Sequence, residues 1–268
     1  THYHYANSNK GEALRGLVMA RNSMIAAHRY PILYSGNTKV SWETLNKLPF
    51  YNLSSSNMGI SWWAHAIGGY LDGTEDGELF MIYVHFITYY LIMMLASEGS
   101  KYYKREPWKW NASHLVVIRD YMQLRQKLIP YIYSEGYVYY KTGLPLVQPL
   151  YYKYPVIYDE PVYKNEYYFG SQLLISPITY HKEYLMDRVI QKLYIPEGIW
   201  YDFKTGKKFP GNHYYISFYK DEDYPVFCKA GGIVVLSNDY MKTALPTNLE
   251  IHIFPGMSNT YKLYEDDG

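Results

Sequence analysis

Three acidic side chains follow a glycine turn in the first third of the chain. Asp72, Glu75 and Asp76 come just after Gly68-Gly69, among two Asp-Gly dipeptides. Carboxyl groups held close together in a pocket can serve as the acid and the base of a reaction. Acids beside Asp-Gly dipeptides, however, are more often turn formers that face solvent. We therefore expect these three residues to shape a loop and not to form an active site.

Few other side chains have a type and spacing that could bind a metal or perform catalysis. The segment Glu265-Asp266-Asp267 is acidic enough to suggest calcium, but it lacks the spacing of a calcium-binding loop and is expected to be a polar turn. No CxxC or HExxH spacing occurs, so no zinc site is indicated. The sequence predicts no metal site and no cofactor.

Composition excludes several classes of partner. The 268 residues carry 26 Lys and Arg against 25 Asp and Glu, which gives a net charge of +1. This balance gives no case for a nucleic acid, an anionic membrane surface or a polyacidic substrate. The single Cys228 excludes an internal disulfide and fits a cytoplasmic protein, as does the lack of a signal peptide in the chain as given.

Aromatic residues are abundant, with 35 Tyr and 6 Trp. Aromatic faces can stack on sugar rings, but Tyr also packs well within strands. The stretch 80–97 contains no Asp, Glu, Lys or Arg and is close to the ~20 residues that span a bilayer. It also holds His85, Thr88 and three Tyr, and no basic cluster flanks it. We expect a buried helix running into a buried strand.

The first half of the chain alternates between strand and helix patterns. A helix followed by a short buried strand is expected over 9–21, with further strands at 29–35, 59–67 and 91–95. Helices are expected from Ser41, a plausible N-cap, from about Glu78, and over 113–140 with a break at Pro130. Such alternation indicates parallel strands joined by crossover helices.

The second half has an all-β pattern. Short strands separated by turn clusters are expected, at 144–149, 173–176, 188–195, 213–219, 233–236 and 250–254. The sequence therefore predicts two domains, an α/β unit over 1–141 and an all-β sandwich over 142–268.

Several strings resemble, in order and spacing, those of glycoside hydrolase family 31, the retaining α-glucosidases and α-xylosidases. The strings are Arg29-Tyr30-Pro31, Tyr34-Ser35-Gly36-Asn37 with Ser41-Trp42, Trp62 to Tyr70, Lys101 to Trp108, Leu124-Arg125 through Tyr131, Pro196-Glu197-Gly198 with Trp200-Tyr201-Asp202, and Tyr264 to Gly268.

The resemblance implies a partial (β/α)8 barrel of TIM type, about strands five to eight, followed by a β-sandwich. Family members hydrolyse α-glycosides with two Asp residues at the mouth of the barrel, a nucleophile and a general acid. The nucleophile belongs to a strand that precedes this chain, so it is absent here. The general acid of the family falls at Asn37, and an amide has no proton to give.

Other substrate-binding positions implied by the resemblance have also changed. The family's Asp before Ile-Gly-Gly is Ala66, and its Arg-x-His on the eighth strand aligns with Met94 and Ala96. Strand alternation would turn the neighbouring His65 away from the sugar. These apolar replacements are expected to be non-functional.

Three further substrate-binding positions keep the family's pattern: Arg29, Trp42 and Tyr70.

Three functions remain open. The chain is a degenerate or fragmentary glycosidase without normal activity, a pseudoenzyme; or a non-catalytic carbohydrate-binding or scaffold module; or an active glycosidase completed by a separate N-terminal half. The expected ligand is an α-linked oligosaccharide. Because four strands cannot close an eight-stranded barrel, we expect a partner at the open edges, either the missing half or a second copy of the chain.

Overall fold

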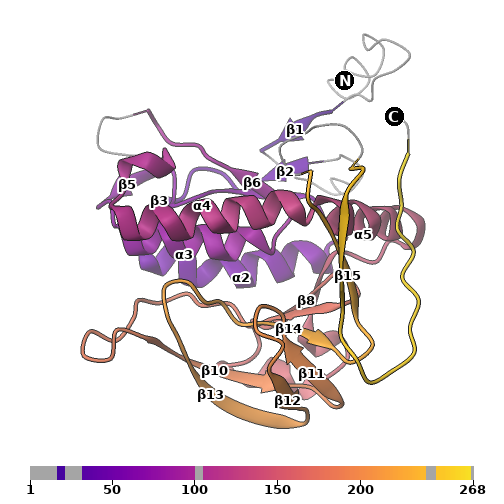
Figure 1. Cartoon of the computed structure of the whole chain (residues 1–268). Helices are drawn as coiled ribbons and strands as arrows, with labels where there is room; N and C mark the ends of the chain where they lie inside the picture. Colours follow the sequence, from indigo (N-terminus) through magenta and orange to yellow (C-terminus); the bar gives the residue numbers. More distant parts are fainter. Residues whose placement is uncertain (1–16, 22–31, 100–104, 240–245, 267–268) are drawn as a thin grey trace.

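The computed structural model describes residues 17–21, 32–99, 105–239 and 246–266 (Figure 1). Arg29 and most of the helix expected within 9–21 lie outside the described residues.

The first half forms a sheet of four parallel strands in the order β1-β2-β4-β6. The strands are β1 (Met19–Ala20), β2 (Ile32–Tyr34), β4 (Trp63–Ala66) and β6 (Ile92–Met94). The register aligns Leu33 with Trp63 and Ala64 with Ile92. Within the described residues the sheet does not close into a barrel, so β1 and β6 each keep one edge without a strand partner. The alternation of strand and helix is confirmed, but β1 is not the buried strand that was expected, because Met19 is 46% exposed at this open edge.

Four helices of the first half begin and end at recognisable signals. They are α2 (Trp42–Asn57), α3 (Gly77–Thr88), α4 (Ala112–Lys127) and α5 (Ile129–Thr142). The Ser41 hydroxyl accepts the Thr44 N–H at 3.1 Å, which confirms the expected N-cap. The expected break at Pro130 is also confirmed, since α4 ends at Lys127 and α5 begins at Ile129. Gly143 ends α5 in the left-handed conformation.

Helix α3 explains the uncharged stretch 80–97. All ten residues from Leu79 to Thr88 are buried, because α3 packs against α4 and lies between the parallel strands and the sandwich (Figure 1). The stretch then continues into a strand, β6, as expected, but this strand is partly exposed at all three positions and not buried. No helix of the described chain is long and apolar enough to cross a membrane.

The second half forms antiparallel sheets. A six-stranded sheet has the order β12-β11-β14-β9-β8-β7, and two hairpin sheets pair β10 with β13 and β15 with β16. The strands are β7 (Val147–Pro149), β8 (Tyr167–Phe169), β9 (Leu173–Ile175), β10 (Val189–Ile195), β11 (Ile199–Asp202), β12 (Lys208–Pro210), β13 (His213–Tyr219), β14 (Val226–Lys229), β15 (Ile233–Ser237) and β16 (Leu249–Ile253). Short 3-10 helices lie at η2 (Pro107–Lys109), η3 (Leu150–Tyr152) and η4 (Pro155–Asp159). The six expected strand regions all contain a strand, whereas β8, β11, β12 and β14 were not predicted.

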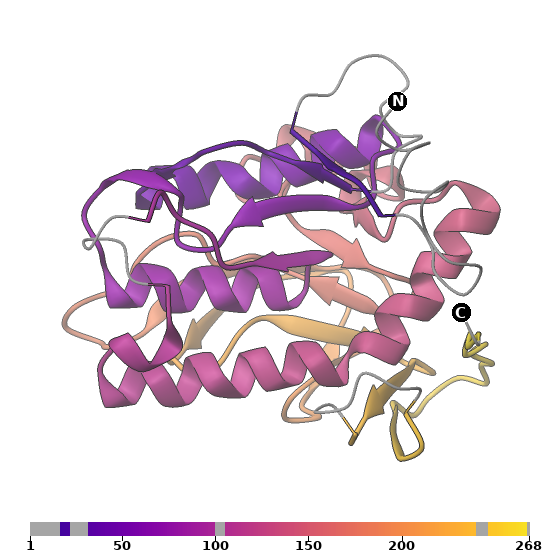
Figure 2. The same ribbon diagram turned by 90° about the horizontal axis from the view of Figure 1, so that it is seen from above.

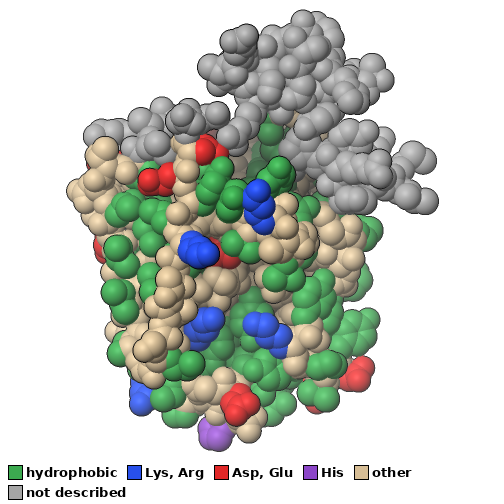
Figure 3. All heavy atoms as spheres, turned by 90° about the vertical axis from the view of Figure 1, so that its right-hand side faces the viewer, with side chains coloured by type: hydrophobic (Ala, Val, Ile, Leu, Met, Phe, Trp, Pro, Cys, Tyr) green, Lys and Arg blue, Asp and Glu red, His purple; other side chains and the backbone are tan. Residues whose placement is uncertain are grey.

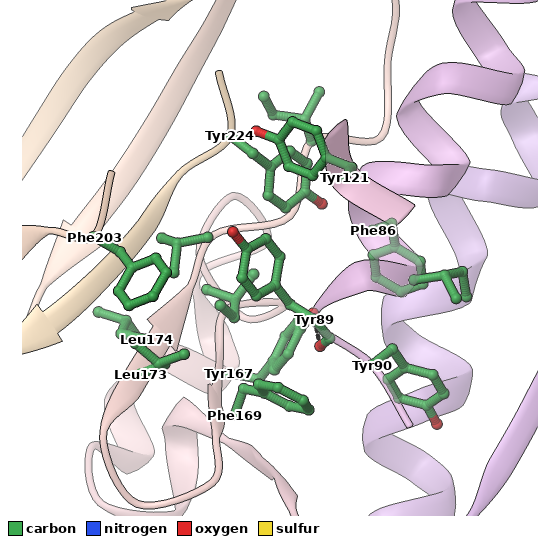
Figure 4. Close-up of a cluster of buried hydrophobic side chains, with 14 of the residues drawn as sticks. Phe86, Tyr89, Tyr90, Tyr121, Tyr167, Phe169, Leu173, Leu174, Phe203 and Tyr224 are labelled. Carbon is green, nitrogen blue, oxygen red and sulfur yellow. Dashed lines mark hydrogen bonds between the residues drawn. The ribbon is translucent and has the colours of Figure 1, made fainter. Parts of the chain in front are cut away.

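Aromatic side chains fill the space between the two halves. Tyr89, which follows the last residue of α3, lies beside Tyr167 of β8, whereas Tyr90 points away and stacks on Phe86 of α3 (Figure 4). The Tyr167 hydroxyl donates to the Tyr89 carbonyl at 3.1 Å. Viewed from above, α2 lies along one side of the parallel strands and α3 and α4 along the other (Figure 2). Many of the tyrosines therefore serve as core residues.

Candidate active site at the strand ends

The candidate site lies where the parallel strands end. Because the four strands run in the same direction, the residues that follow them meet at one edge of the sheet. Arg21 follows β1, Asn37 follows β2 and Tyr70 follows β4. Met94 is the last residue of β6.

Asn37 is exposed and contacts one neighbouring phenol. The Tyr34 hydroxyl donates to Asn37 Oδ1 at 3.4 Å. Burial raises the pKa of Tyr34, the nearby Tyr70 raises it further, and Arg21 opposes the shift. The structure thus brings an amide, two phenols and a guanidinium close together at the strand ends.

Arg21 was not recognised as a site residue from the sequence. Its guanidinium lies 3.4 Å from where a Cβ on Gly36 would stand, so the glycine leaves room for it. The available signal was a basic residue directly after a strand of the parallel set. Arg29 lies outside the described residues.

The loops after β2 and β4 are joined by a small parallel ladder. Strand β3 (Lys39–Val40) pairs with β5 (Leu71–Gly73), and the Tyr70 N–H donates to the Thr38 carbonyl at 2.7 Å. A Cβ on Gly69 would stand 2.6 Å from the Lys39 carbonyl oxygen and 2.8 Å from the Val40 nitrogen. Only glycine allows this approach, which explains the second glycine of the turn.

The loop acids have structural partners. Glu75 lies 3.7 Å from the Arg105 guanidinium, whose Nη2 also donates to the Gly69 carbonyl at 2.7 Å. The side chain of Glu75 is 18% exposed, so the expectation of a solvated turn former is wrong for this residue. Asp72 is exposed, as expected, but it lies within strand β5 and not in a turn, with a φ of 42°.

Trp42 and Asp76 connect two helix starts. The Trp42 indole N–H donates to Asp76 Oδ2 at 3.0 Å, while Asp76 Oδ1 accepts the N–H groups of Glu78 and Leu79. Asp76 is therefore the N-cap of α3, and its second carboxylate oxygen accepts a hydrogen bond from the first residue of α2, so neither oxygen is free.

Ala66 and Met94 are register partners on adjacent strands, and the Ile67 N–H donates to the Met94 carbonyl at 3.0 Å. Ala66 is fully buried, whereas Met94 and Ala96 are partly exposed. His65 lies on the other face of β4 and contacts Asn52 Oδ1 of α2 at 2.5 Å, as strand alternation indicated. Neither Ala66 nor Met94 offers a polar group to a ligand.

The acidic segment near the end of the chain is anchored by phenols. Asp266 accepts hydrogen bonds from Tyr133 at 2.8 Å and from Tyr264 at 2.7 Å. The described parts of the chain contain no group of three or more His, Cys, Asp or Glu side chains that could hold a metal ion.

Chemically, the strand-end groups can bind hydroxyls. The amide of Asn37 both donates and accepts, Tyr34 and Tyr70 offer phenols, and Arg21 offers a cation. A carboxyl group that could protonate a leaving oxygen is missing at the end of β2, where the resemblance places the family's acid.

Comparison with known proteins identifies the family. Residues 1–135 match the model of the glycosyl hydrolases family 31 TIM-barrel domain, and residues 143–234 match that of the family 31 C-terminal domain. An α-xylosidase of Saccharolobus solfataricus is 28% identical over 262 residues, which cover 95% of this chain and 35% of the relative. An α-glucosidase of Bacillus thermoamyloliquefaciens is also 28% identical, over 95% of this chain and 32% of the relative.

Solved structures share the same fold. A Flavobacterium johnsoniae family 31 dextranase complexed with isomaltotriose superposes with a TM-score of 0.87 at 25% identity, over 99% of this chain and 34% of the dextranase. The chain thus spans about a third of the length of these relatives. The domain matches and the ordered strings at the strand ends together show that this chain belongs to glycoside hydrolase family 31.

Proposed function

We propose that this chain is a degenerate family 31 glycosidase half that retains sugar-binding groups at its strand ends but lacks normal α-glycosidase turnover. One observation carries the proposal: Asn37, an amide, stands at the end of β2 where the resemblance places the acid. The relatives named as an α-xylosidase and an α-glucosidase indicate terminal α-xylosides and α-glucosides as the ligand class.

The surrounding substitutions support the loss of activity by the whole site, and not the loss of a single catalytic group. Ala66 and Met94 face each other across adjacent strands, so the apolar surface is continuous there. The nearby acids are committed elsewhere, Glu75 to Arg105 and Asp76 to the α3 cap and Trp42. Neither is placed to replace the missing acid.

Leaving-group dependence tests this proposal. A retaining glycosidase that lacks only its acid still cleaves glycosides whose leaving group needs no proton, whereas poor leaving groups depend on the acid. We expect no turnover above background of nitrophenyl or methyl α-glucosides and α-xylosides by the natural full-length protein. Turnover of methyl glycosides that is abolished by Asn37→Ala would contradict the proposal and support an active enzyme completed by another half.

A second function, non-catalytic sugar binding, is favoured by the cluster of Arg21, Tyr34, Asn37 and Tyr70. Isothermal titration with malto- and xylo-oligosaccharides tests it, with Tyr70→Ala as the binding-deficient variant. Heats that are equal for both proteins, or absent at millimolar sugar, would reject binding at the strand ends.

We further propose that a partner covers the open edges at β1 and β6. Exposed strand edges pair readily with other chains, and Met19 and Leu95 add exposed apolar surface there. Light scattering combined with size-exclusion chromatography is expected to show an assembly at micromolar concentration. A monodisperse monomer that melts cooperatively would contradict this.

A further inference from the structure

A pocket of about 290 Å³ lies beside the six-stranded sheet, where β14 ends and β11 begins. Its wall is built from residues 153–154, 168, 171, 197–200, 229–230 and 257–259. Figure 3 shows the side of the molecule that carries β15 and α5, where two Lys or Arg side chains lie on either side of an apolar hollow. Positive charge beside an apolar space is the combination that the pocket residues also provide.

Two lysines belong to the same aromatic wall of this pocket. Lys229 ends β14 and lies opposite Trp200 of β11 in the antiparallel register, so both side chains point to one face of the sheet. The Trp200 ring contacts the Tyr168 ring at 6.2 Å between centroids. The Lys153 ammonium lies 4.5 Å from the centroid of the same Tyr168 ring, where cation–π attraction holds it. The fold thus directs two ammonium groups toward one pocket.

Neither lysine has a counter-charge. Among the residues that the structure describes, no hydrogen bond and no ion pair within 4 Å reaches either ammonium group. Burial lowers the pKa of Lys153, and the charge of Lys229 lowers it further. Like charges near each other repel, and partial burial weakens the screening by water and salt. An anion between the two ammonium groups would relieve this repulsion, so the wall favours a negatively charged ligand.

The rest of the wall agrees with an anion. It holds one acid, the exposed Glu197, so two ammonium groups against one carboxylate leave a net positive charge. The Ser258 hydroxyl makes no hydrogen bond to the described residues and can donate to an oxyanion. Ile199 and Met257 supply apolar wall for the carbon atoms of a ligand.

Two point charges favour phosphate over carboxylate. A lysine ammonium is a compact point charge that suits phosphate oxygens. A phosphate monoester carries about −1.5 to −2 charges at pH 7, whereas a carboxylate carries one. The pocket also lies near the lower limit of small-molecule sites, about 300 Å³, so it has room for the body of a small ester.

We propose that this pocket binds a phosphate group between Lys153 and Lys229, carried by a small ester or free in solution. The site lies within the sandwich and does not rest on the function proposed for the strand ends.

Isothermal titration of the full chain with inorganic phosphate, glycerol phosphate and glycerol tests the proposal. We expect both phosphates to bind and glycerol not to bind. Lys153→Met and Lys229→Met each remove a charge but keep an apolar stem, and each is expected to weaken phosphate binding at least threefold. Glu197→Gln removes a repelling charge and is expected to strengthen binding about twofold. Lys208→Met, which changes an exposed lysine of β12 outside the wall, is the matched control and is expected to leave binding unchanged.

The two sources of phosphate are distinguished by their affinities. Glycerol phosphate that binds more tightly than inorganic phosphate would assign the site to an ester, and equal affinities would assign it to free phosphate. Either result supports the proposal if the lysine variants weaken the binding.

Four outcomes would overturn the proposal. One is the absence of binding at millimolar phosphate. Another is binding that Lys153→Met leaves unchanged, and this exposed residue decides the question even if Lys229→Met fails to fold. A third is glycerate, the carboxylate analogue, binding as tightly as glycerol phosphate. The last is phosphate binding abolished by Tyr70→Ala, which would move the ligand to the strand ends.

Discussion

His85 is a buried histidine without a hydrogen-bond partner. Both ring nitrogens are unpartnered, and the ring contacts Tyr121 at 3.9 Å and Tyr224 at 5.5 Å between centroids. An unsatisfied buried donor or acceptor costs on the order of 1–3 kcal/mol, and a neutral imidazole has one of each. Losing a ring contact costs about 0.5–1.5 kcal/mol. We therefore expect His85→Leu to raise the free energy of unfolding by roughly 2 kcal/mol at pH 7.

His65 gives the matched contrast, because its Nε2 contacts Asn52 Oδ1 while Nδ1 is unpartnered. The change His65→Leu removes the unpartnered Nδ1, which is favourable, but it leaves Asn52 Oδ1 without its partner, which is unfavourable by a similar amount. The lost hydrogen bond between Nε2 and Oδ1 therefore decides the sign of the change in stability. We expect this variant to be about 1 kcal/mol less stable at pH 7.

Acid dependence provides a second measurement. Burial lowers the pKa of His65 and of His85 from 6.5 to about 3. The unfolded chain then binds more protons than the folded chain between pH 6.5 and 3, so stability falls as the pH falls through this window. From pH 7 to 5 each histidine removes about 2 kcal/mol, at 1.36 kcal/mol per pKa unit.

Urea unfolding at pH 7 and pH 5 tests both effects. Each Leu variant is expected to lose about 2 kcal/mol less than the parent protein between the two pH values. The reasoning about His85 is refuted if His85→Leu destabilises the protein by more than 1 kcal/mol at pH 7 or leaves the acid dependence unchanged.

Three further predictions follow from the packing. Gly69→Ala is expected to lower stability by about 2–4 kcal/mol, since its Cβ would meet backbone atoms. Gly99 has a similar positive φ but open space around it, so Gly99→Ala is expected to cost clearly less. Equal melting temperatures of the two variants would exclude the clash. Because burial raises the pKa of Glu166, the folded chain holds its proton above pH 4.5 and stability falls as the pH rises from there; Glu166→Gln is expected to remove this fall in urea titrations at pH 5, 7 and 9, and an identical slope would contradict it. Burial raises the pKa of Cys228 to about 12, so its thiol is expected to resist a disulfide reagent until urea unfolds the chain; reaction within seconds in the native state would show that the site is open.

The sequence predicted elements that repeat a period or carry a cap. Helix α2 was expected from Ser41 and the break between α4 and α5 from Pro130, because these signals act within a few residues. Strand β8 shows the limit. Both β8 and β9 are buried at every position and lack the alternation that marks a half-buried strand; the aliphatic β9 was predicted, whereas the tyrosine-rich β8 was not recognised.

The candidate site was predictable only where order along the chain was sufficient. Asn37 was located by its place after the Gly36 turn. The roles of Glu75 and Asp76 were not, because their partners Arg105 and Trp42 lie about 30 residues away in sequence. Such contacts depend on how the loops fold over the sheet, which no local pattern specifies.

The ladder between β3 and β5 makes the two strand-end loops a single mechanical unit. Hydrogen bonds from the Tyr70 and Leu71 N–H groups to the Thr38 carbonyl, and the approach of Gly69 to Val40, fix each loop against the backbone of the other. A loop graft from a related enzyme would therefore need to carry residues 36–42 and 67–73 together, since either loop alone would lose the backbone with which it pairs. The same coupling means that new specificity at this edge can evolve only by concerted change in both loops.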